Sequence, residues 1–97
     1  MKKLPANAIA YRKTPIFTQE TIPEGLLHRH TTQEGRWGKI AVVSGQLCYR
    51  ILTDRPEEHR LTPSLPGIVE PQVPHQVSSP GPVEFYVEFY KVPSSPN

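Results

Sequence analysis

The chain has 97 residues, which is enough for one domain with a modest core. Eleven basic and nine acidic residues give a net charge of +2, which favours neither a nucleic-acid partner nor an anionic membrane. No stretch approaches the roughly 18 apolar residues of a membrane-spanning helix, and no signal-peptide apolar run follows Lys2 and Lys3. The single cysteine, Cys48, cannot form an internal disulfide, and we expect a cytoplasmic protein.

Twelve prolines are spread along the chain, leave no long window for a helix and favour an all-β domain of short strands. In chain order we expect strands at residues 8–13, 25–30, 37–44, 46–53, 58–62, 68–70, 73–78 and 83–91. The last strand is the clearest, because apolar residues alternate along it with polar or amphipathic ones, which places the two sets on opposite faces. The set expected in the core is Val83, Phe85, Val87 and Phe89. Residues 1–92 should form the domain and residues 93–97 a disordered tail.

The histidines are the residues that could carry chemistry. His28 and His30 are two apart on an expected strand, so both should point to the same inward face. Two imidazoles side by side are preset to chelate a metal ion, and Glu34 could add a carboxylate oxygen. His75 alternates with two valines and should face inward with them. The alternative for each histidine is a core residue with satisfied hydrogen bonds, and for Glu34 a solvated loop carboxylate. His59 has charged neighbours and is expected at the surface.

The order of these motifs resembles the two conserved motifs of the cupin superfamily. The resemblance is carried by the histidines and glutamate of residues 28–34, a strand pair that turns at Gly45, and residues 66–75. It implies a single-domain cupin-type β-barrel, which is a double-stranded β-helix or jelly roll. It also implies a divalent metal ion, with Zn, Fe, Mn and Ni left open. The implied ligands are His28, His30, Glu34 and His75.

A more specific resemblance covers nearly the whole chain. Residues 36–42, 68–72 and 74–77 are similar to the small N-terminal domain of TehB-type tellurite-resistance proteins and its stand-alone relatives. Full-length members of that family add a methyltransferase domain that uses S-adenosylmethionine. Because the chain has no glycine-rich nucleotide turn and ends before such a domain could begin, we do not expect methyl transfer.

Three functions from different classes follow from this reading. The first is a metal-binding domain that takes a small molecule or an oxyanion at the metal, with Arg29 or Arg36 assisting near the mouth. The second is a metal-dependent enzyme such as a dioxygenase or an isomerase. The third is a metal-free structural domain that acts by association. A homodimer is expected, with Trp37, Tyr86 and Tyr90 as interface residues, and neither nucleic acid nor a membrane as partner.

Overall fold

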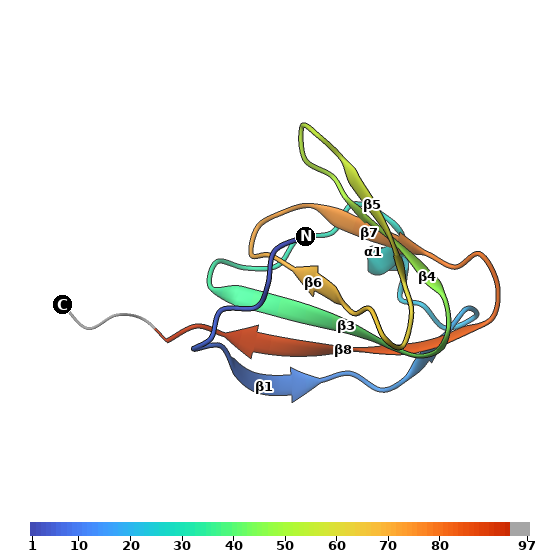
Figure 1. Ribbon diagram of the computed structural model, residues 1–97, viewed down its shortest axis with the longest axis horizontal. Helices are drawn as coiled ribbons and strands as arrows, with labels where there is room; N and C mark the ends of the chain where they lie inside the picture. The colour runs from blue at the N-terminus through green and yellow to red at the C-terminus, as the bar shows by residue number, and fades with distance from the viewer. Residues whose placement is uncertain (94–97) are drawn as a thin grey trace.

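The computed structural model describes residues 1–93, which fold into two antiparallel β-sheets with the core between them (Figure 1). The larger sheet has the strand order β1-β8-β3-β6, and β2 also pairs with β8. Its strands are β1 (Ile9–Lys13), β2 (Phe17–Thr18), β3 (Arg36–Gly45), β6 (Gly67–Val69) and β8 (Val83–Lys91). The smaller sheet has the order β5-β4-β7. Its strands are β4 (Leu47–Ile51), β5 (Glu57–Leu61) and β7 (His75–Ser78). The predicted all-β class is confirmed.

Strand β8 organises the larger sheet, because it pairs with β1 and β2 on one side and with β3 on the other. Its bounds coincide with the predicted strand at residues 83–91. Val83, Phe85 and Val87 are buried, as the period-two pattern predicted, while Phe89 is half-buried against the core. The opposite face of β8 is polar or amphipathic, so one side of the sheet points toward the smaller sheet and the other points outward.

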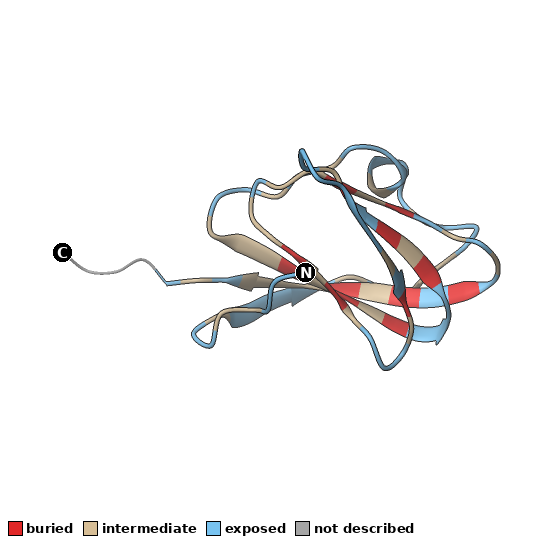
Figure 2. Cartoon of the chain, turned by 45° about the horizontal axis from the view of Figure 1, so that its top comes forward, coloured by how far each residue is buried: buried red, intermediate tan, exposed pale blue. Residues whose placement is uncertain are grey.

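The core lies between the two sheets, and buried residues recur along the strands that face it (Figure 2). The largest fully buried side chain is Tyr49 on β4. Its hydroxyl donates a hydrogen bond of 2.9 Å to the carbonyl oxygen of Ile68 on β6, so this bond links the smaller sheet to the larger one. A buried phenol needs such a partner, because an unpaired hydroxyl in the core costs free energy.

The prediction of a closed barrel is wrong, because within residues 1–93 the two sheets are not joined into one hydrogen-bonded ring. Prolines provide the physical reason at one side. Pro66 precedes β6, and Pro71 and Pro74 lie between β6 and β7. Proline has no N–H to donate, so the ladders stop at these residues. Among the described residues, the smaller sheet continues beyond β7 only as an isolated bridge between His30 and His75.

The expected strand at residues 25–30 is also wrong. The chain forms the short helix α1 (Glu24–Leu27) there, which lies beside β7 (Figure 1). Pro23 precedes it with φ of −55°, a value that suits the start of a helix, and Glu24 places an acidic side chain in the first turn. In the part of the chain that the structure describes, no helix is long and apolar enough to cross a membrane. Residues 94–97 of the predicted tail lie outside the described residues.

Candidate functional site

A cavity of about 290 Å³ lies between the sheets, next to α1. Its walls are mainly apolar, because the core-facing side chains of β3, β6, β7 and β8 meet there without filling the space. The apolar lining includes Phe17, Ile40, Val69, Val77, Phe85 and Val87. Its polar side chains are two imidazoles, two threonines and one guanidinium. An apolar pocket with a few polar groups is the usual form of a small-molecule site.

His30 and His75 form the polar end of this cavity. Their backbones are bridged by two hydrogen bonds of 2.9 Å, each from the N–H of one residue to the carbonyl oxygen of the other. This bridge brings the side chains together: Nδ1 of His30 lies 3.4 Å from Nε2 of His75, and the rings meet edge to face at 78°. His75 is only 3% exposed, whereas His30 is half-buried. The sequence placed both residues in one site, and the structure brings them together.

The surroundings of His75 hold its ring in one orientation. Its Nδ1 lies 3.1 Å from the carbonyl oxygen of Val73, and the ring of Tyr49 packs against it at 6.0 Å between centroids. Burial lowers the pKa of His75; the bond to the Val73 carbonyl opposes this shift and the neighbouring His30 adds to it. His75 is therefore neutral at neutral pH.

The other predicted site residues lie elsewhere. His28 follows α1 with 71% of its side chain exposed, and its Nε2 lies 3.3 Å from a carboxylate oxygen of Glu24. Glu34 is exposed in the turn before β3, and Arg29 is exposed beside His28. Arg36 lies over the ring of Tyr11, at 4.9 Å from its centroid. None of these four predicted residues lines the cavity. His28 lies outside the cavity because the segment before it forms helix α1, so the alternation expected of a strand does not apply there.

The sequence reasoning missed the other polar residues of the cavity: Arg12, Thr14 and Thr32. Arg12 lies on β1 just after a register shift between Ala10 and Arg12 in the pairing with β8. Such a bulge changes which residues face inward, and plain alternation does not reveal it. Thr14 is fixed by its hydroxyl, which accepts a 2.9 Å hydrogen bond from the N–H of Val87. No short motif marks these residues in the sequence.

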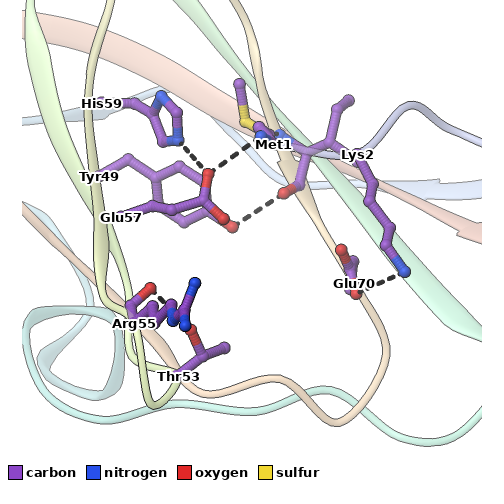
Figure 3. A network of polar contacts seen from close by, with 9 residues as sticks. Met1, Lys2, Tyr49, Thr53, Arg55, Glu57, His59 and Glu70 are labelled. Carbon is purple, nitrogen blue, oxygen red and sulfur yellow. Dashed lines mark hydrogen bonds and ion pairs between the residues drawn. The ribbon is translucent and has the colours of Figure 1, made fainter.

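A second polar cluster lies on the other side of Tyr49, around Glu57 (Figure 3). One carboxylate oxygen of Glu57 accepts a 3.0 Å bond from the ammonium of Met1 and lies 2.9 Å from Nε2 of His59. These hydrogen bonds lower the pKa of Glu57. Lys2 lies 4.0 Å from a carboxylate oxygen of Glu70 in the same region. His59 thus has a local hydrogen-bond partner in Glu57 and stands apart from the cavity, which agrees with its expected place near the surface.

The fold and the cavity define a small all-β domain with an internal, largely apolar pocket. The chain belongs to the TehB-like domain family, which matches residues 12–87.

Two curated relatives from Haemophilus influenzae, strains KW20 / Rd and 10810, are each named a probable S-adenosyl-L-methionine-dependent methyltransferase TehB. They are 36% and 35% identical over 75 residues, or 73% of this chain. The chain spans about a quarter of their length, at 26%.

Two solved structures share the fold. The crystal structure of TehB from H. influenzae superposes with a TM-score of 0.81 at 33% identity, over 90% of this chain and 32% of that one. A protein from E. coli strain K12 superposes with a TM-score of 0.84 over 97% of this chain and 100% of its own. At 21% identity, this second likeness concerns the fold alone.

These findings correct the expected function and cofactor. Among residues 1–93 no group of three or more His, Cys, Asp or Glu side chains could hold a metal ion. The relatives are named as methyltransferases that use S-adenosylmethionine, and not as metal proteins. The prediction of a metal-binding cupin with Zn, Fe, Mn or Ni is therefore wrong.

Proposed function

We propose that this chain is the small-molecule-binding domain of a TehB-type methyltransferase, and that its cavity holds the molecule to be methylated. The observation that carries the proposal is the cavity of about 290 Å³ with apolar walls and the His30–His75 pair at one end. A compact apolar molecule with one polar group matches this lining. The link to methyl transfer is supported by the names of the relatives.

S-adenosylmethionine itself does not fit this cavity. The molecule carries a sulfonium, an ammonium group and ribose hydroxyls, and buried cations need acidic partners. No carboxylate lies among the lining residues, whose permanently charged member is Arg12. We therefore assign S-adenosylmethionine to the larger part of a TehB-type protein that lies beyond this domain.

An oxyanion is a second candidate for the cavity, and Arg12 is the observation that favours it. Guanidinium groups bind oxyanions with paired, charge-assisted hydrogen bonds. Arg12 lines the cavity and is its free donor, because the hydroxyls of Thr14 and Thr32 donate to backbone carbonyl oxygens. This residue replaces Arg29 and Arg36 as the expected anion contact. Tellurite should then perturb the NMR signals of the cavity residues, and Arg12→Gln should abolish the effect. An equal perturbation in Arg12→Gln would rule out this contact.

We also propose that residues 1–92 form one jelly-roll domain of the cupin type. A jelly roll has eight strands divided between two sheets. Here β1, β3, β6 and β8 share one sheet, β4, β5 and β7 share the other, and the bridge at His30 lies at the outer edge of β7. Residue 30 then takes the place of the eighth strand. Slow amide exchange at His30 and His75 would support this pairing, and unprotected exchange at both would contradict it.

The proposed function is tested in a chimera. The segment of H. influenzae TehB that matches this chain is replaced by the chain, and methyl transfer from labelled S-adenosylmethionine to a compact apolar acceptor with one polar group is measured. Val69→Phe fills the cavity from β6, since Val69 is 3% exposed and lines it. Gly38→Ala narrows it more gently, because the new methyl group would lie 3.2 Å from Cβ of Val69. Val43→Phe is the control, because Val43 is 47% exposed on β3.

We expect both cavity variants to raise the KM for the acceptor and to leave the KM for S-adenosylmethionine unchanged. The control should match the parent chimera in both constants. Melting curves identify a variant that fails to fold. If Val69→Phe does not fold, the acceptor KM of Gly38→Ala tests the proposal. Unchanged acceptor KM in folded variants of both kinds would refute the proposal.

A further inference from the structure

The hydrogen bonds of the histidine pair determine which ring nitrogens carry a hydrogen. A carbonyl oxygen can only accept, so Nδ1 of His75, at 3.1 Å from the carbonyl oxygen of Val73, carries the hydrogen. In a neutral imidazole the other nitrogen is then an acceptor, which makes Nε2 of His75 an acceptor. Nδ1 of His30, at 3.4 Å from that nitrogen, must therefore be the donor between the two rings.

When the His30 ring is neutral, its remaining nitrogen, Nε2, carries a lone pair and no hydrogen. Within the described residues the side chain of His30 makes its hydrogen bond through Nδ1 to His75, and no buried polar atom lacks a partner. Nε2 of His30 therefore reaches accessible space, and His30 lines the cavity. The chain of bonds from Val73 through His75 thus leaves Nε2 as an accessible hydrogen-bond acceptor on a residue that lines the apolar pocket.

We propose that this cavity selects molecules that donate a hydrogen bond to Nε2 of His30, such as a small apolar alcohol, phenol or thiol, and discriminates against their methylated forms. A methyl ether or thioether has no hydrogen on its oxygen or sulfur, so it leaves Nε2 of His30 without a donor. The apolar walls would otherwise favour the methylated form, because an added methyl group increases the apolar area that is buried. The inference rests on the proposed function of the cavity and names the class of molecule that it takes.

Phenol and anisole form a matched pair for the test, since anisole is the methyl ether of phenol. Both are titrated into labelled protein at about pH 8, well above the reference histidine pKa of about 6.5, and followed by NMR at the cavity residues. We expect phenol to bind about tenfold more tightly than anisole, as one hydrogen bond allows. In His30→Phe the ring remains and the acceptor is lost, so the preference for phenol should disappear. His28→Phe is the control and should keep it, because His28 is exposed outside the cavity.

The proton positions are tested separately with long-range ¹H–¹⁵N spectra of the imidazoles. Both His75 and His30 should carry their hydrogen on Nδ1, and a hydrogen on Nε2 of His75 would overturn the inference. Equal or tighter binding of anisole to the parent protein would also overturn it, while leaving the cavity as a binding site. Binding of neither compound would instead refute the proposed function on which the inference depends.

Discussion

His75 should make the folded chain lose stability as the pH falls below about 6.5. Burial lowers its pKa in the folded chain. In the unfolded chain the same side chain titrates near the reference value of about 6.5. Between these two pKa values the unfolded chain binds more protons than the folded one, so the free energy of unfolding falls as the pH falls. Above about 6.5 His75 is neutral in both states and contributes no slope.

The size of the effect follows from one proton. A difference of one bound proton changes the free energy of unfolding by at most about 1.4 kcal/mol for each pH unit. In His75→Asn the amide can still donate to the carbonyl oxygen of Val73 but does not titrate. This variant should be less stable at neutral pH, because the smaller side chain leaves a void beside Tyr49 in a site that is 3% exposed. Its stability should nevertheless vary less with pH.

The assay is urea unfolding between about pH 5 and pH 8, followed by the fluorescence of Trp37, the single tryptophan. His28→Asn is the matched control, because it removes an exposed histidine and keeps His75, so the slope that His75 contributes should remain. Equal slopes in the parent and in His75→Asn below about pH 6.5 would show that burial does not shift the titration of His75.

Three further predictions concern the fold and its assembly. Gly45→Ala should destabilise the chain by about 3 kcal/mol, because Gly45 has φ of 78° and the new Cβ would clash with the carbonyl oxygen of Pro82. Gly35→Ala, at φ of 74° with open space around it, should lose only about 1 kcal/mol, and equal losses in urea unfolding would disprove the clash. Tyr49→Phe should lose about 1 kcal/mol with the bond to Ile68, and an unchanged melting temperature would contradict this. The homodimer remains a prediction. Sedimentation should give about twice the chain mass of 11.0 kDa, and a monomer at every concentration would contradict the prediction.

Much of the fold could be predicted from local patterns. Prolines excluded long helices, and the alternation along residues 83–91 located β8 and its buried face. The same alternation placed His75 inward between two valines, and it is buried. These predictions hold because a strand has a period of two and because proline acts on its own backbone, so neither depends on distant residues.

The site was harder to predict, because its geometry depends on segments that are far apart in the sequence. His28 and His30 should have shared a face, but Pro23 and Glu24 start a helix in that segment and His28 turns to solvent. Arg12 reaches the cavity only because the pairing of β1 with β8 shifts its register. Pro23 and Glu24 are a short local signal for the helix, whereas no local signal in the sequence marks the register shift.

The sequence by itself determined that this protein is an all-β domain, that His75 lies inside it, and which family it resembles. Only the tertiary structure decided that His30 and His75 meet across a backbone bridge, that His28 and Glu34 do not join them, and that a cavity remains between the sheets. The physical reason is that side-chain periodicity is a local property of the backbone. A cavity depends instead on how two sheets pack and where their edges end, which is fixed by contacts between residues distant in the chain.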